Sequence, residues 1–441
     1  MRHRLIASYK GNDPRAASPV SDDQQHHDDN KANVYHRHKT LLLFLCLGVA
    51  ALVVVGGATF WWLEPCIVLE RFWFPELMDE QQCKALAEHT KKIRLLTYTS
   101  GFRDVWEAQL LTPSGEGRGE GEGRREGEGE GDLPRVVLKE LKRDSGCGNI
   151  KAHFREVVIE RELSHPNIVP FVGACNLGPP LYWHTLAQAY VSGSGTFHNL
   201  DLRGKPLAWS YAIMVDMARG LHYLHTSPIG MIVHDDLNWH QVLVGRVHPS
   251  LLPSKNDITS KKEEAEEGRE RAYITDLNLA TVVSHATGRV NGSSGGLMRH
   301  WWPKGGSWKF FAPEKLRLKE AYTEKVDIWS FGVLYYQFLV KLSNANTNHI
   351  KNKNKNKKHD NPNYGEEWSA ITKTKYQETV LYEPNGWRPK RPSAASDAEW
   401  NFVERCWQFD ASLRPSSEEV LRFVENFSAS IVEKEAAEEK K

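Results

Sequence analysis

Residues 232–244 read IVHDDLNWHQVLV and form the most informative segment of this 441-residue chain. Two apolar runs enclose a short polar loop, in which Asp236 is followed five residues later by Gln241. Carboxylate and amide oxygens are groups that can bind protons or hard cations, so the loop carries candidate functional residues.

The neighbouring segments supply the other groups that phosphoryl transfer needs. This chemistry requires a cation on the phosphates and carboxylates on the metal side and the acceptor side. Asp276 follows a charged run, within Thr275-Asp-Leu-Asn278. Upstream, Lys139 ends an apolar strand-like run, where an ammonium group is costly unless it is paired. Glu156, on the helix predicted to follow, is the expected partner of Lys139.

The segment 232–244 resembles the catalytic loop of protein kinases. Asp236 takes the position of the catalytic aspartate in that family, and Gln241 stands where the family has a metal-binding Asn. Asp276 matches the first residue of the Asp-Phe-Gly motif, and its carboxylate is the expected principal magnesium ligand.

Three downstream segments resemble structural signatures of the large lobe of kinases. They are Ala312-Pro-Glu314, Asp327–Gly332, and the stretch from Cys406 to Pro415. The resemblance implies a buried ion pair between Glu314 and Arg414. Several motifs in the correct order make a stronger argument than any one of them, because independent coincidences would have to align.

The resemblance implies an α+β fold, the bilobal protein-kinase fold, with a small β-rich N-lobe and a larger helical C-lobe. It also implies ATP and Mg²⁺ or Mn²⁺ as cofactors. Lys139 would hold the α- and β-phosphates, Glu156 would orient Lys139, and Asp236 would position the acceptor hydroxyl. Gln241 and Asp276 would hold the metal ion. The nucleotide contacts implied by the resemblance come from Lys139, Gly101, Val105, Gln188 and Tyr190.

Some positions depart from the kinase pattern. The loop 98–106 has one glycine where the family usually has three, which affects how closely the backbone can approach phosphates. Asp235 replaces the usual Arg before the catalytic aspartate, which removes the cation that pairs with a phosphorylated activation loop. Asn238 replaces the usual Lys, so another group must stabilise the transferring phosphate. Two interpretations therefore stay open: an active kinase, or a pseudokinase that serves as a nucleotide-binding or scaffold module.

A subgroup resemblance concerns the acceptor. Cys83 before a glycine-poor loop, the segment 223–230, Gln241 and Asp276-Leu are similar to protein O-mannose kinase. That family phosphorylates the 6-hydroxyl of a protein-linked mannose in the lumen. The His-x-Asp pattern at 234–236 is instead closer to tyrosine-kinase-like domains. The predicted acceptor is therefore either a protein-linked mannose or a Ser, Thr or Tyr side chain.

Residues 41–63 form a run of 23 residues without a charge, long enough for a transmembrane helix. Arg71 is the one Lys or Arg in the first 20 residues after it, whereas seven precede it: Arg2, Arg4, Lys10, Arg15, Lys31, Arg37 and Lys39. This bias predicts a cytosolic N-terminus and a kinase domain in the ER or Golgi lumen or outside the cell. A receptor kinase with an outside sensor is disfavoured, because the charge bias runs the wrong way.

Disulfides and glycans would fit that location. The disulfide candidates are Cys66, Cys83, Cys147, Cys175 and Cys406, with their pairing left open. Asn291 and Asn426 begin triplets of the glycosylation type. Lys and Arg total 57 against 56 Asp and Glu, which gives no electrostatic case for a nucleic-acid partner.

The chain is predicted to divide into a cytosolic polar tail (1–40), the membrane helix (41–63), a stem (64–92), the kinase-like domain (93–430) and a charged tail (431–441). Polar composition predicts solvated insertions at 114–132, 253–271 and 343–365. Apolar periodicity predicts further elements: a hairpin of strands at 104–111 and 135–141, helices at 152–163, 211–225 and 325–340, and strands at 242–244 and 272–275.

Overall fold

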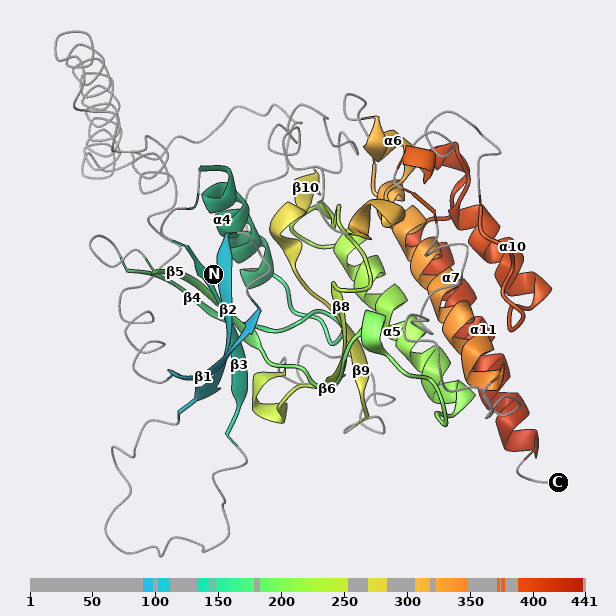
Figure 1. Cartoon of the computed structure of the whole chain (residues 1–441), viewed down its shortest axis with the longest axis horizontal. Coiled ribbons are helices and arrows are strands. Elements are labelled where there is room, and N and C mark those ends of the chain that lie inside the picture. The colour runs from blue at the N-terminus through green and yellow to red at the C-terminus, as the bar shows by residue number, and fades with distance from the viewer. Residues whose placement is uncertain are drawn as a thin grey trace, which may run out of the picture. The chain divides into compact units, whose positions relative to one another are not determined.

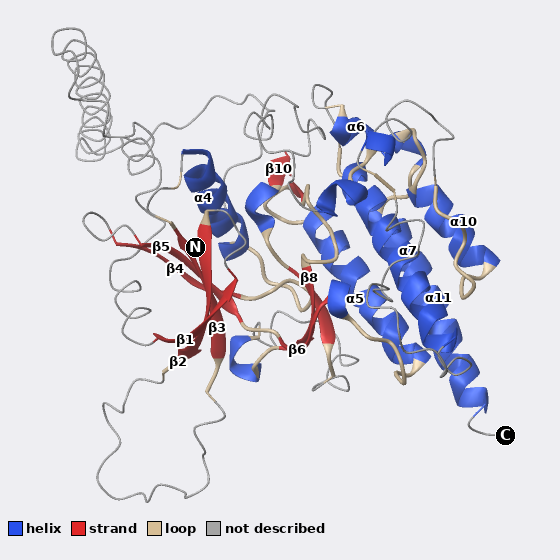
Figure 2. Cartoon of the chain, in the orientation of Figure 1, coloured by secondary structure: helices blue, strands red, loops and turns tan. Residues whose placement is uncertain are grey.

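The structure is a computed structural model of the chain. It describes residues 90–97, 102–111, 133–142, 145, 147–177, 183–252, 269–283, 306–317, 323–347, 371–372, 374–376 and 388–438. All of them lie in the compact unit that runs from Phe74 to Lys441. Strands dominate the N-terminal part of this unit and helices dominate the rest (Figure 2).

A five-stranded antiparallel sheet forms the N-terminal part, with the strand order β1-β2-β3-β5-β4 (Figure 1). The strands are β1 (Thr90–Thr97), β2 (Arg103–Leu110), β3 (Arg135–Leu141), β4 (Phe171–Leu177) and β5 (Trp183–Ala189). The hairpin predicted from the short β-branched runs is confirmed by β2 and β3. In their register Val105 lies opposite Lys139.

The helix α4 (Cys147–Arg161) packs against β4 and carries Glu156. It begins five residues before the predicted helix and ends two residues earlier. Its buried residues include the apolar Ile150, Phe154 and Val157 as well as the charged Glu156. Pro166 follows shortly after the helix and disfavours helical backbone angles at the residue before it.

The C-terminal part is built mainly from helices. Their bounds are α5 (Leu207–His225), the short α6 (Pro313–Leu316), α7 (Lys325–Thr347), α10 (Asp397–Cys406) and α11 (Ser417–Glu438). α11 packs along α5, and α10 packs on α7. The two predicted helices at 211–225 and 325–340 are confirmed within α5 and α7; α5 begins four residues earlier than predicted, and α7 ends seven residues later.

Two small sheets connect these helices to the loop 232–244. One is antiparallel with the order β6-β8-β9, and the other pairs β10 with β7. Their strands are β6 (Ser192–Thr196), β7 (Met231–Val233), β8 (Val242–Arg246), β9 (Arg271–Ile274) and β10 (Thr281–Val283). β7 and β8 flank the loop, and β9 leads directly to Asp276.

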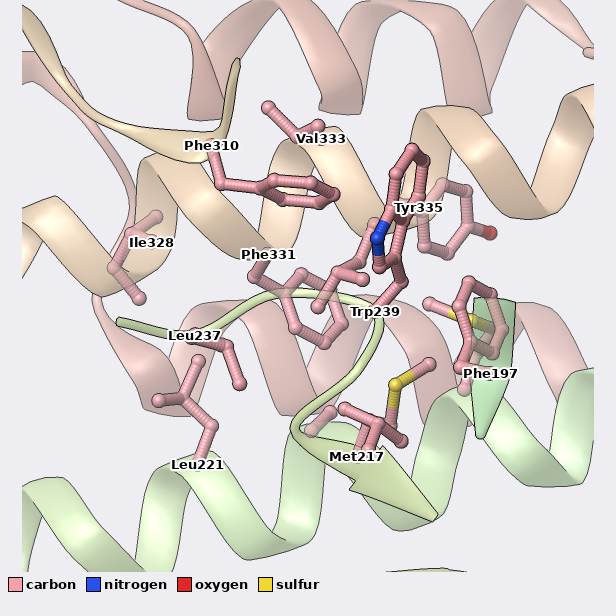
Figure 3. Close-up of a cluster of buried hydrophobic side chains, with 14 of the residues drawn as sticks. Phe197, Met217, Leu221, Leu237, Trp239, Phe310, Ile328, Phe331, Val333 and Tyr335 are labelled. Carbon is pink, nitrogen blue, oxygen red and sulfur yellow. The ribbon is translucent and has the colours of Figure 1, made fainter. Parts of the chain in front are cut away.

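The loop 232–244 is anchored in the main apolar core by Trp239. This side chain is 4% exposed and lies among buried side chains that include Phe197, Met217 and Phe310 (Figure 3). Its ring meets that of Phe310 edge-on, with centroids 5.0 Å apart. Burial of a large aromatic side chain in the middle of the loop restrains the polar residues on either side of it.

Two insertion boundaries predicted from composition are wrong. Residues 269–271 belong to the folded core region: Arg269 donates two hydrogen bonds, of 2.7 and 2.8 Å, to the buried carboxylate of Asp216, and Arg271 begins β9. Ser343 to Thr347 continue α7, where the Ser343 hydroxyl donates to the Leu339 carbonyl and accepts from the Ala394 amide. Charged or polar residues stay ordered at both places because a partner neutralises or bonds them.

The cysteine predictions have different outcomes. Cys406 is not a disulfide cysteine: its thiol is free and fully buried, and burial raises its pKa to about 12. It faces Gly332 of α7, where an added Cβ would come within 2.6 Å of the Cys406 Cβ atom. Cys175 on β4 is disulfide-bonded.

No helix among the described residues has the length and the apolar character needed to cross a bilayer. The predicted membrane helix at 41–63, the polar tail at 1–40 and the insertion at 114–132 all lie outside the described residues, as do Gly101 and Asn291. Asn426 is exposed on α11.

Candidate active site

The centre of the site is the ion pair predicted between Lys139 and Glu156, which is present. Lys139 Nζ on β3 donates to Glu156 Oε1 on α4 at 2.7 Å. Both groups are buried, at 8% and 0% exposure. Burial acts against both charges, but their mutual attraction raises the pKa of Lys139 and contributes to lowering that of Glu156 to about 2. The pair is therefore charged at neutral pH.

Glu156 forms an ion pair with a second cation besides Lys139. Arg103 lies at the first position of β2 and forms an ion pair with Glu156 Oε2, with 2% of its side chain exposed. Burial works against the ionised form of Glu156, and the largest opposing effect on its pKa comes from the charge of Arg103. Each oxygen of the Glu156 carboxylate thus faces a different cation, which fixes the direction of the side chain.

Asp276 is the second carboxylate close to the Lys139 ammonium. Its Oδ1 atom lies 3.8 Å from Lys139 Nζ, and its side chain is 27% exposed. Asp276 has a left-handed backbone, with φ of 66° and ψ of 63°. Such angles are costly for a residue other than glycine, so the surrounding structure must hold them. The left-handed angles come directly after β9 and bring the carboxylate to the side of Lys139.

The backbone of the loop before Asp236 is held by the carboxylate of Asp327, at the start of α7. Asp327 accepts backbone hydrogen bonds from His234 at 2.8 Å and from Asp235 at 3.0 Å. Its Oδ2 atom also lies 3.0 Å from His225 Nε2. Burial alone would raise the pKa of Asp327, but the hydrogen bond and charge of His225 help to lower it overall. The backbone on the N-terminal side of Asp236 is therefore tied to the helical core.

Asp236 and Gln241 lie together in this loop. Burial raises the pKa of Asp236 to about 7, and the negative charges of Asp276 and Asp235 raise it further. The charge of Lys315 and a side-chain hydrogen bond with Gln241 act in the opposite direction. A hydrogen bond of 3.0 Å from the Thr275 amide to the Gln241 carbonyl connects the loop to the segment that carries Asp276. Burial and neighbouring charges keep this pKa near neutrality, which suits a group that accepts and releases a proton.

Gln188, predicted to contact the nucleotide, points to α4. Its Nε2 atom donates to both oxygens of Glu160 at 2.7 Å, and both side chains are buried. Burial, together with the charge of Glu156, raises the pKa of Glu160 to about 8. Glu160 is therefore an acid that holds its proton at neutral pH, one helical turn beyond Glu156.

The other predicted nucleotide contacts lie nearby on the sheet. Val105 on β2 is half-buried opposite Lys139. Tyr190 follows β5; its backbone amide donates to the Arg135 carbonyl at 3.0 Å, and its ring lies 4.5 Å from the Arg135 guanidinium carbon. The structure thus brings the carboxylates of Glu156 and Asp276 to the same Lys139 ammonium.

The structural ion pair predicted from the downstream motifs is also present. Arg414 Nη1 donates to Glu314 Oε1 at 2.6 Å, and Nη2 donates to Oε2 at 2.9 Å. The Arg414 side chain is fully buried and also donates to the Lys325 carbonyl. This bidentate pair holds the segment around α6 against the C-terminal helices.

Three charged residues of the site were not predicted from the sequence: Arg103, Glu160 and Lys315. Lys315 on α6 lies 3.0 Å from Asp235 Oδ1, with 6% of its side chain exposed. Arg103 and Lys315 each adjoin a recognised segment, and an unexplained charge at such a position is the signal that could have identified them. Glu160 lies on the apolar face of α4, where its carboxylate interrupts the apolar pattern.

Comparisons with known proteins agree with this geometry. A family model described as "Protein tyrosine and serine/threonine kinase" matches residues 119–424, more than half of the chain. The chain is 24% identical to "Probable serine/threonine-protein kinase drkB" of Dictyostelium discoideum over 66% of this chain and 33% of that protein. It is 24% identical to "Serine/threonine/tyrosine-protein kinase HT1" of Arabidopsis thaliana over 63% of this chain and 55% of that protein. The matches thus span less than two thirds of these relatives.

Proposed function

The chain belongs to the protein tyrosine and serine/threonine kinase family, and from this membership we propose that it transfers the γ-phosphate of ATP to a hydroxyl group on a protein. One observation carries the proposal: Lys139 Nζ lies 2.7 Å from Glu156 and 3.8 Å from Asp276. A fixed cation next to a partly exposed carboxylate provides a phosphate-binding group beside a metal-binding group.

In this proposal the residues act as follows. Lys139, oriented by Glu156, holds the α- and β-phosphates. Asp236 accepts a hydrogen bond from the acceptor hydroxyl and takes its proton, for which a pKa of about 7 is suitable. The Asp276 carboxylate and the Gln241 amide oxygen fit Mg²⁺, because this ion prefers oxygen ligands and is commonly held by few protein groups. When bound, the ion would neutralise negative charge on the phosphates.

The decisive test compares the wild-type protein with Asp276→Asn in a phosphotransfer assay with radiolabelled ATP, Mg²⁺ and casein. We expect the variant to lose activity by several orders of magnitude, because much of the charge compensation in the transition state is lost. Asp397→Asn is the matched control, since its carboxylate is 89% exposed on α10. Full activity of Asp276→Asn would show that the assignment is wrong.

Thermal unfolding in the presence of MgATP separates catalysis from binding. A ligand that binds only the folded state at 100 times its Kd stabilises by about 2.7 kcal/mol, which is easily measured. A shift in the midpoint without transfer to any acceptor would identify the chain as a nucleotide-binding module, the pseudokinase alternative.

We also propose that residues 41–63 anchor the protein in a membrane, with the catalytic domain in the lumen or outside the cell. The uncharged run and the seven basic residues before it support this orientation. A disulfide at Cys175 supports it too, because disulfides persist in oxidising compartments. In sealed vesicles, a C-terminal tag should resist protease added from the cytosolic side; digestion of the tag would reverse the orientation.

The acceptor is proposed to be a Ser, Thr or Tyr side chain, as the names of the relatives suggest. A protein-linked mannose is the second candidate, and the disulfide at Cys175 favours testing it, because lumenal domains meet glycoproteins. The test offers one peptide in two forms, with a free hydroxyl and with an O-linked mannose. Transfer to the sugar alone would replace the side-chain proposal.

A further inference from the structure

Lys315 brings a buried positive charge to the catalytic loop from a distant part of the chain. It is the third residue of α6, and its Nζ atom lies 3.0 Å from Asp235 Oδ1. The two side chains are 6% and 4% exposed. The ammonium also lies 4.0 Å from the centroid of the Phe311 ring. A buried cation needs such partners, because desolvation costs several kcal/mol per ion in proteins.

The backbone around Asp235 directs this pair toward the catalytic position. Asp235 has a φ of 67°, unusual for a residue other than glycine, and its amide is fixed by the Asp327 carboxylate at 3.0 Å. Asp236 is the next residue. The ammonium of Lys315 is bound to the carboxylate of the residue that directly precedes Asp236, so it brings a positive charge to the part of the loop that carries Asp236.

The loop itself has no cation to offer. Residues 232–244 contain no Lys and no Arg. Asn238, where kinases usually have a Lys, is used for the shape of the loop: its Nδ2 atom donates to the Asp236 carbonyl at 2.8 Å, and its Oδ1 atom accepts from the His240 amide at 2.9 Å. The negative charges of Asp235 and Asp236 thus need a cation from outside the loop, and Lys315 is placed to provide it.

We propose that Lys315 is a positioning residue for phosphoryl transfer, whose ammonium supplies beside Asp236 the positive charge that the catalytic loop lacks at Asn238. This role rests on the proposed kinase function. Lys315 acts through the carboxylates of Asp235 and Asp236: it keeps two adjacent negative charges compatible, so that Asp236 stays directed to the acceptor hydroxyl. A buried ion pair is weak evidence for stability, since an apolar pair of the same size often stabilises as well. A role in catalysis explains why the charges are there.

The test separates charge from folding by three variants. Lys315→Met removes the cation. Lys315→Met with Asp235→Asn removes the pair without leaving a buried carboxylate unpaired, and therefore protects the fold. Adding Asn238→Lys to this double variant returns a cation to the loop. For each, kcat and KM for ATP are measured with Mg²⁺ and casein, together with the unfolding midpoint. Lys205→Met is the control, since that lysine is 40% exposed.

We expect both variants without a cation to lose at least about 10-fold in kcat with KM for ATP changed little, because the lost interaction concerns the reacting groups and not ATP binding. Asn238→Lys should recover a substantial part of kcat, whereas Lys205→Met should behave as the wild type. The double variant should keep an unfolding midpoint close to that of the wild type.

Two results would overturn the role of Lys315. One is a wild-type kcat in the double variant. The other is a loss of kcat that Asn238→Lys does not recover, since a purely structural role would give that result. A wild-type protein that transfers no phosphate would refute the proposed function together with this role, whereas an active wild type with an equally active double variant would refute this role alone.

Discussion

The buried acid Glu160 gives the protein a pH-dependent stability that one substitution should remove. Its side chain is 3% exposed on α4, and both of its oxygens accept from Gln188 Nε2 at 2.7 Å. Burial, then the charge of Glu156, raises its pKa from 4.5 to about 8. Glu160→Gln keeps the size of the protonated acid and, like it, has one carbonyl acceptor and one donor group, but it cannot ionise.

The sign of the effect follows from proton binding. Between pH 4.5 and 8 the folded protein holds a proton on Glu160 that the unfolded chain has released, so the free energy of unfolding falls as pH rises through this window. At 1.36 kcal/mol per pH unit, the loss is about 3 kcal/mol by pH 7 and approaches about 5 kcal/mol above pH 8. The stabilisation is complete below pH 4.5. Glu160→Gln should therefore be as stable as the wild type at pH 5 and more stable by a few kcal/mol at pH 8.5.

Urea unfolding at pH 5, 7 and 8.5, followed by tryptophan fluorescence, measures these differences. Glu162→Gln is the matched control: it lies two residues along, its side chain is 47% exposed, and it should leave the pH dependence unchanged. Equal stabilities of Glu160→Gln and wild type at pH 8.5 would refute the reasoning, because they would mean that Glu160 ionises in the folded protein without cost.

Two further predictions concern the other buried charges. Arg103→Met should lower the free energy of unfolding by about 2 kcal/mol, measured by urea unfolding. The loss is smaller than the 3–5 kcal/mol typical of a buried charge left without any partner, because Lys139 still pairs with Glu156. An unchanged stability would show that Arg103 contributes nothing to holding Glu156. Arg414→Met leaves Glu314 without its bidentate partner and should lower the unfolding free energy by about 3–5 kcal/mol, measured in the same way, with the exposed Arg422→Met near zero.

The sequence predicted the order of the elements well where local pattern and fold agree. Short β-branched and apolar runs identified the hairpin of β2 and β3, and helical periodicity identified parts of α4, α5 and α7. The pair Lys139–Glu156 was predicted because an ammonium in an apolar run needs a partner, and it is present. The pair Glu314–Arg414 was predicted through the family resemblance and is also present.

Composition was a poorer guide at the edges of the charged segments. Arg269 belongs to a run of charged residues, yet its guanidinium neutralises the fully buried Asp216 on α5. The two residues are 53 positions apart in the chain. Nothing in a local window distinguishes an arginine that faces solvent from one that meets a buried carboxylate, because the difference lies in the partner. The same reason explains why Ser343 was assigned to a solvated insertion.

The unpredicted site residues share one physical property: each places a charge or a titratable acid where a pattern based on single positions expects a neutral side chain. Arg103 adds a second cation to Glu156, which one lysine would already neutralise. Glu160 stays compatible with this cluster by holding its proton, and Lys315 offsets the adjacent carboxylates of the catalytic loop. The Arg103–Glu156 pair joins β2 to α4, and the Lys315–Asp235 pair joins α6 to the loop 232–244, so both pairs form only in the folded protein. A residue-by-residue comparison with kinases therefore shows that Asn238 stands where they usually have a Lys, whereas the three-dimensional arrangement shows that Lys315 brings a positive charge to the same loop.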